Sequence, residues 1–138
     1  MKVKFIIKGA FYGDKTLPSL NDYLNELGRN PLKGGEMKRK YMNIIIRCVR
    51  ADLRQFSTKD KVVINYRFFE PNSGQIRDVM NIFSLTDKFV EDALVKLKVL
   101  PDDSPKYVVN TTHEFTYTNG TPFIEVEIEE LEKSKNAN

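Results

Sequence analysis

The spacing of apolar residues predicts two long amphipathic helices. Between Glu36 and Phe56, apolar side chains recur every three or four positions, which is the period of one face of an α-helix. The members of this first stripe are Met42, Ile45, Ile46, Val49, Leu53 and Phe56. The same period returns after Arg77 and predicts a second helix. Pro101 ends this helix. The members of the second stripe are Ile82, Leu85, Phe89, Ala93 and Leu97.

Four other stretches alternate between apolar and polar residues, as half-buried strands do. They are residues 2–8, Lys61–Phe69, Lys106–Thr118 and Phe123–Leu131. The last two are separated by Asn119-Gly120, a dipeptide that favours a tight hairpin turn. The pattern therefore predicts one α+β domain over residues 1–138. In it, a single layer of about four mixed or antiparallel strands packs against the two long helices.

The remaining segments predict connections. Ser19 is expected to cap a short helix that runs to about Leu27 and ends at Gly28. The segment Arg29–Gly35 combines two glycines with basic and amide side chains, so it predicts a loop. That loop either closes over a phosphate or only connects two helices. Residues 131–138 are mostly polar and are expected to form a disordered tail.

Composition narrows the class of protein. No apolar run approaches the roughly 20 residues that span a bilayer, so no membrane association is expected. The single cysteine, Cys48, excludes an internal disulfide and suits the reducing cytoplasm. Cys48 and the single histidine, His113, are too few for a structural zinc site, and both are expected to be structural residues. The phosphate-loop and serine-elbow motifs are missing, which sets aside two further classes of enzyme.

The charge is unevenly distributed along the chain. The net charge is +3, but residues 1–69 carry +9 and residues 70–138 carry −6. On the first helix, one row at steps of three and four has no acidic member: Lys40, Asn43, Arg47, Arg50 and Arg54. A solvated face ordinarily mixes signs, because opposite charges one turn apart stabilise a helix. The row therefore favours a nucleic-acid contact, with a plain solvated face as the alternative.

Carboxylates lie at both ends of the second helix. Asp78 precedes it, where backbone N–H groups favour an anion, and Asp102 and Asp103 follow Pro101. Taken singly, these residues suit a helix cap and a turn. Taken with Lys88, they match phosphodiester hydrolysis, in which oxygen ligands hold Mg²⁺ and a lysine stabilises the developing charge. They can meet only if the chain after the helix folds back along it.

The order and spacing of three short motifs resemble the RusA-type Holliday junction resolvases, small dimeric endonucleases of bacteria and their phages. The motifs are Arg77-Asp78-x-x-Asn81, Lys88 four residues before Asp92-Ala93-Leu94, and Leu100-x-Asp102-Asp103. The similarity extends upstream to Pro18–Tyr23 and Lys33–Lys40, and downstream to the last predicted strand. It thus covers nearly the whole chain.

The resemblance implies a Mg²⁺-dependent endonuclease that resolves branched DNA as a homodimer in the cytoplasm, with Mn²⁺ as an alternative metal. It assigns Asp78, Lys88 and Asp103 to catalysis, and Asp78, Asp103 and Asp102 to the metal. DNA contacts are expected from Lys33, Lys38, Lys40, Arg47, Arg50, Arg54, Arg77 and Asn81.

One residue departs from the family pattern. Met80 stands where the family has a second aspartate, and a thioether is a poor ligand for Mg²⁺. Either another carboxylate substitutes, with Asp87 and Asp102 as candidates, or catalysis is weakened or lost. The alternative function is therefore a junction-binding protein without activity on the same scaffold. A third interpretation is a structural protein with incidental similarity, which would leave the basic row without a role.

Overall fold

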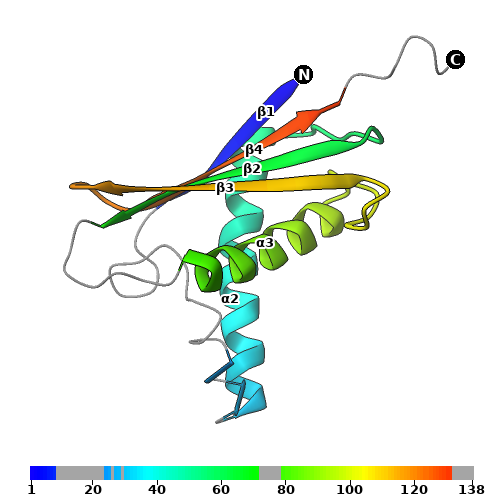
Figure 1. Cartoon of the computed structure of the whole chain (residues 1–138). Coiled ribbons are helices and arrows are strands. Elements are labelled where there is room, and N and C mark those ends of the chain that lie inside the picture. Colours follow the sequence, from blue (N-terminus) through cyan, green and yellow to red (C-terminus); the bar gives the residue numbers. More distant parts are fainter. Residues whose placement is uncertain (9–23, 26, 29, 72–78, 132–138) are drawn as a thin grey trace, which may run out of the picture.

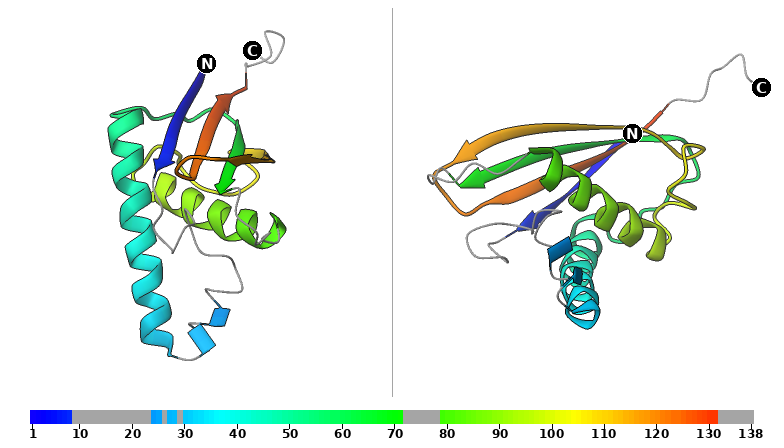
Figure 2. Two further views of the ribbon diagram at one scale, coloured as in Figure 1. Left: turned by 90° about the vertical axis from the view of Figure 1, so that its left-hand side faces the viewer. Right: turned by 60° about the horizontal axis from the view of Figure 1, so that its bottom comes forward.

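The computed structural model describes residues 1–8, 24–25, 27–28, 30–71 and 79–131. Its elements, in chain order, are β1 (Lys2–Lys8), α2 (Pro31–Leu53), β2 (Val62–Pro71), α3 (Val79–Lys96), β3 (Val108–Thr118) and β4 (Phe123–Glu130). The strands form one four-stranded mixed sheet, and both helices pack on the same face of it (Figures 1 and 2). The predicted α+β class is confirmed. None of the described helices has the length and apolar character needed to cross a membrane.

The order of strands in the sheet is β1-β4-β2-β3 (Figure 1). Strand β4 is antiparallel to both β1 and β2, whereas β3 is parallel to β2. The predicted hairpin at Asn119-Gly120 is therefore wrong, because β3 and β4 lie on opposite sides of β2. The connection passes the end of β2, where Pro71 is paired with Thr118 and Phe69 with Phe123.

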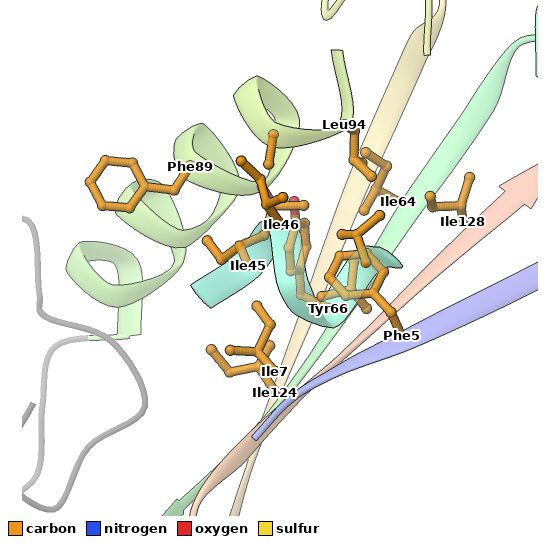
Figure 3. Close-up of a cluster of buried hydrophobic side chains, with 14 of the residues drawn as sticks. Phe5, Ile7, Ile45, Ile46, Ile64, Tyr66, Phe89, Leu94, Ile124 and Ile128 are labelled. Carbon is orange, nitrogen blue, oxygen red and sulfur yellow. The ribbon is translucent and has the colours of Figure 1, made fainter. Parts of the chain in front are cut away.

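One face of the sheet and one face of each helix form a single hydrophobic core (Figure 3). On β2 every second side chain is buried: Val62, Ile64, Tyr66, Phe68 and Glu70. Both predicted helix stripes are buried as expected, apart from Leu97 and Phe56, which are half-buried. Burying each large apolar side chain contributes about 1.5–3 kcal/mol, so this interface dominates the stability of the fold.

The first long helix begins earlier than its sequence predicts. Pro31 is its first residue, so the expected loop at Arg29–Gly35 is wrong over most of its length. The side chain of Asn30 accepts a hydrogen bond from the N–H of Leu32 at 3.0 Å, and proline suits the first helical position. Helical residues 24–25 and 27–28 precede it, and a Cβ added at Gly34 would overlap the side chain of Leu27. The remaining residues of the short helix predicted to begin at Ser19 lie outside the described ranges.

The other sheet face is polar and is held together by contacts between neighbouring strands. Lys4 on β1 pairs with Glu125 on β4 at 2.7 Å, and Arg67 on β2 pairs with Glu114 on β3 at 3.2 Å. At the outer edge of β1, the N–H of Ile6 donates to a carboxylate oxygen of Asp52 on α2 at 2.8 Å. Asp52 is thus turned toward the sheet and away from the basic row of α2.

Candidate active site and nucleic-acid interface

A group of acidic side chains gathers along α3, beneath the middle of the sheet. The hydroxyl of Tyr66 on β2 donates to Asp87 on α3 at 2.8 Å. Burial raises the pKa of Tyr66 well above its ordinary value, and the neighbouring charge of Asp87 raises it further. Tyr66 therefore stays a hydrogen-bond donor throughout the physiological pH range and fixes the position of the Asp87 carboxylate.

Glu91 lies one helical turn after Asp87 and shares a hydrogen bond with it. Burial, and then this hydrogen bond and the charge of Asp87, raise the pKa of Glu91 from 4.5 to about 9. At neutral pH, the carboxyl group of Glu91 therefore keeps its proton and donates a hydrogen bond to Asp87. The charges of Asp103 and Asp92 act on Glu91 in the same direction, so the chain after α3 returns close to this part of the helix.

The two aspartates after Pro101 are both exposed. The N–H of Asp103 donates to a carboxylate oxygen of Asp102 at 2.9 Å, which is a local turn contact. That N–H, together with the side chain of Ser104, lowers the pKa of Asp102, which favours its charged form. Asp102 thus presents a charged, solvent-accessible carboxylate after the end of α3, and the exposed side chain of Asp103 lies next to it.

The other predicted residues of α3 lie along one side of the helix, because Asn81, Lys88 and Asp92 are seven and four positions apart. Lys88 is exposed, and Asn81 is half-buried. Asp92 forms an ion pair with Lys38 of α2 at 3.6 Å, so Lys38 is held against α3 and is less accessible to DNA than the sequence suggests. Met80 is 54% exposed in the first turn. The first residue of α3, Val79, is twelve positions before Glu91. The start of the helix and Glu91 are therefore separated by about 18 Å along the helix axis.

Several predicted site residues cannot be placed. Asp78 and Arg77 lie outside the described residues, and so does the side chain of Lys33. Within the ranges that the structure describes, no three His, Cys, Asp or Glu side chains are close enough together to hold a metal ion. The metal ligands expected from the resemblance, Asp78 with Asp103 and Asp102, therefore remain a prediction.

The basic row of α2 is exposed along its whole length. Its members are Lys40, Asn43, Arg47, Arg50 and Arg54. Nζ of Lys40 lies 5.5 Å from the centre of the Tyr41 ring, so this lysine also covers part of the core. Among the described residues, no carboxylate forms an ion pair with Arg47, Arg50 or Arg54. These three guanidinium groups are free to bind an anionic partner.

The sequence did not single out Tyr66 or Glu91. The signal for Glu91 was available, because Asp87 and Glu91 are four residues apart and so share one side of a helix. Tyr66 gave no such signal, because a tyrosine in a strand is most simply a core residue. Its hydrogen bond to Asp87 depends on how α3 packs beneath β2.

Comparisons with models of known protein families and with curated proteins find no match for this chain. The resemblance to RusA-type resolvases therefore stays a prediction that rests on the sequence motifs alone.

The proton held by Glu91 makes the stability of the fold depend on pH. Because its pKa is raised on folding, the favourable contribution of Glu91 is complete below about pH 4.5 and is lost as the pH rises toward 9. We expect Glu91→Gln, which is neutral at every pH, to be more stable than the wild type at pH 8 by about 1–2 kcal/mol. The value is modest because the half-buried carboxyl is partly screened by water. The difference should vanish near pH 4.

Urea unfolding of the wild type and of Glu91→Gln between pH 4 and 8.5 measures this difference. Glu36→Gln, at an exposed position on α2 that forms no ion pair among the described residues, is the matched control and should keep the pH dependence of the wild type. Parallel stability curves for the wild type and Glu91→Gln would contradict the assignment of a bound proton to Glu91.

Proposed function

We propose that this protein is a Mg²⁺-dependent, structure-selective endodeoxyribonuclease that cuts branched DNA in the cytoplasm as a homodimer. The observation that carries the proposal is the exposed face of α2, where Arg47, Arg50 and Arg54 have no acidic partner among the described residues. A face with one sign of charge gives up helix-stabilising pairs, which is favourable when a polyanion supplies the opposite charge.

The position of the acidic group supports a reaction at the phosphate. The ion pair between Lys38 and Asp92 places α2 against the part of α3 that carries Glu91. DNA bound along α2 would thus run close to the carboxylates of α3 and of the turn after it. Lys88 is exposed on α3 and is the residue proposed to stabilise charge on the phosphate.

The donor atoms are of the type that Mg²⁺ prefers, because all of them are carboxylate oxygens. Asp103 and Asp102 would hold the ion together with Asp78. When bound, the ion supplies a Lewis acid for the phosphate and lowers the pKa of a bound water. The role of the chain itself is to position these carboxylates and to hold Lys88 beside them.

A second candidate function is junction binding without cleavage. Two observations favour it. Met80 is exposed where a second aspartate of the family would stand, and Glu91 keeps a proton that it shares with Asp87. Both features reduce the negative charge that attracts a divalent cation. Cleavage of a synthetic four-way junction across a Mg²⁺ titration separates the two functions. Nicked products support the endonuclease, whereas tight binding without products at any Mg²⁺ or Mn²⁺ concentration supports the binding protein.

Reversing the charge of the basic row tests DNA binding separately from chemistry. We expect Arg47→Glu combined with Arg50→Glu to weaken junction affinity by at least about tenfold. It should also lower the slope of log affinity against log salt by about two, because two fewer phosphate contacts release counterions. Both side chains are exposed, so the fold should persist. Fluorescence anisotropy with a labelled junction over a salt series measures both quantities.

The matched control is Lys59→Glu combined with Lys61→Glu, which reverses two exposed charges away from the row. If the two double variants lose affinity equally, binding follows the total charge of the protein, and α2 is not the interface.

A further inference from the structure

A hollow of about 410 Å³ lies where the carboxyl-terminal ends of α2 and α3 come together. Three cationic side chains line it: Arg50 and Arg54 from α2, and Lys98 from the turn after α3. Its apolar lining includes Phe56, Leu97 and Val99. No carboxylate lines the hollow, and none forms an ion pair with these three cations among the described residues. The hollow thus combines a positive rim with an apolar floor.

The backbone at two of these cations is unfavourable for their residue type. Arg54 has φ 56° and ψ −115°, and Lys98 has φ 60°. They are the only described non-glycine residues with positive φ, and both line this one hollow. Glycine or asparagine adopts such angles at lower cost, so a long cationic side chain at each position goes against the local backbone preference. Strain of this kind concentrates at ligand-binding sites.

Local effects at the ends of the two helices explain part of the arrangement of these three cations. A cation at the last turn of a helix is stabilised by the helix dipole, and the N–H of Val99 closes α3 by donating to the carbonyl of Leu94 at 2.9 Å. Each cation separately fits this explanation. It does not account for the convergence of both helix ends on one apolar floor. Three full positive charges also outweigh the two partial negative charges of the helix ends, so the hollow favours an anion.

We propose that this hollow binds one nucleotide unit, with its phosphate held by Arg50, Arg54 and Lys98 and its base against Phe56. The shape suits this ligand because every base has an apolar face that stacks on an aromatic ring, while the charge lies on the phosphate. Arg50 and Arg54 also end the basic row, so a strand that follows α2 arrives at the hollow. The inference rests on the proposed binding of DNA but not on cleavage. The nucleotide belongs to the bound strand, and a free nucleotide offers the same chemistry.

Lys98→Asn tests the site without disturbing the fold, since asparagine tolerates positive φ and removes the charge. The matched control is Lys96→Asn, which removes an exposed charge two residues away and outside the hollow. Anisotropy with a labelled junction and with a single-stranded oligonucleotide measures affinity over a salt series. We expect Lys98→Asn to weaken binding about five- to tenfold at 0.1 M salt and to lower the salt slope by about one. Lys96→Asn should stay within about twofold of the wild type.

A second measurement locates the ligand and separates its two sources. Amide NMR spectra of the wild type are recorded with the oligonucleotide, with deoxyadenosine monophosphate and with inorganic phosphate. Shifts at Phe56, Lys98 and Val99 on adding the oligonucleotide, absent in Lys98→Asn, support the site. The same shifts with the mononucleotide show that free nucleotides also enter, whereas their absence restricts the site to a strand.

The proposal is overturned if folded Lys98→Asn and Lys96→Asn bind DNA equally well, or if the oligonucleotide leaves the three amides unshifted. If the wild type binds no DNA at all, the proposed function fails, and the mononucleotide titration then decides on the hollow alone. Shifts at Phe56 and Val99 that Lys98→Asn abolishes would retain a nucleotide site, and unchanged spectra would remove it.

Discussion

Replacing Asp103 by asparagine is expected to lower the rate of junction cleavage by at least about a hundredfold, the scale of losing one group that stabilises the reacting phosphate. The substitution keeps the shape of the side chain but removes its negative charge and most of its affinity for Mg²⁺. Asp103 is exposed, so the fold should not change. Junction affinity should stay the same or increase, because a carboxylate no longer repels the phosphate. Single-turnover cleavage and anisotropy binding, measured on the same junction, check both expectations.

Glu114→Gln is the control for the removal of a negative charge, because Glu114 is exposed on β3 and pairs with Arg67 on the opposite face of the sheet. It should cut at the rate of the wild type. Cleavage by Asp103→Asn at the rate of the wild type would remove this residue from the proposed metal site. A loss of binding that matches the loss of cleavage would show that Asp103 acts on DNA affinity and not on the chemical step.

The second large effect is a gain of activity in Met80→Asp. Met80 is 54% exposed in the first turn of α3, so a carboxylate there needs no rearrangement of the core. It lies at the helix end that favours negative charge, and it places an aspartate where the RusA-type pattern that the sequence resembles has its second one. We expect cleavage at 1–2 mM Mg²⁺ to rise at least about tenfold, the scale on which groups around a metal alter its affinity. Half-saturation should move to lower Mg²⁺ concentration.

Ser84→Asp provides the control, because it adds the same charge at an exposed position one turn further along α3. It should leave cleavage unchanged. Fast wild-type cleavage at low Mg²⁺ that Met80→Asp fails to increase would show that other ligands already complete the site. Absence of cleavage in both proteins would favour the binding-only function.

The strongly periodic segments of the fold could be predicted from the sequence, and the connections could not. The stripes from Met42 to Leu53 and from Ile82 to Ala93 are buried as predicted, because only one face of each helix meets the sheet. The start of α2 was missed since two glycines outweighed the Asn30-Pro31 capping signal. Leu27 can pack over Gly34 only because glycine has no side chain there. This tertiary contact cannot be predicted from the local sequence.

The pairing of the strands could also not be predicted from local sequence patterns. Asn119-Gly120 does mark a chain reversal, but a turn signal does not specify which strand lies alongside. The parallel pairing of β2 with β3 depends on α3, which crosses beneath them and places the ring of Phe83 against that of His113 at 4.5 Å. Contacts of this kind join residues that are thirty positions apart, so they have no signature in a short window of sequence.

In the candidate site, the part that could be predicted from the sequence is the exposure of the basic row. The row from Lys40 to Arg54 is exposed, as its spacing indicated. The shared proton of Asp87 and Glu91 was missed, since it arises from burial beneath the sheet and from the approach of Asp103. The ion pair of Lys38 with Asp92 was missed for a similar reason, because it depends on the angle at which two helices cross. Burial and helix crossing are properties of the assembled layers.

The place of β4 between β1 and β2 has a consequence for how the protein forms during synthesis. Strand β4 is the last of the described strands to be translated, yet it is the only one that joins β1 to the rest of the sheet. Until it emerges from the ribosome, β1 has no partner strand, and β2 can pair only with β3. A nascent chain arrested before Phe123 should therefore leave its amino-terminal strand open to proteases and chaperones. Completion of the sheet then depends on contacts between the two ends of the described chain, which form slowly because they close the longest loop.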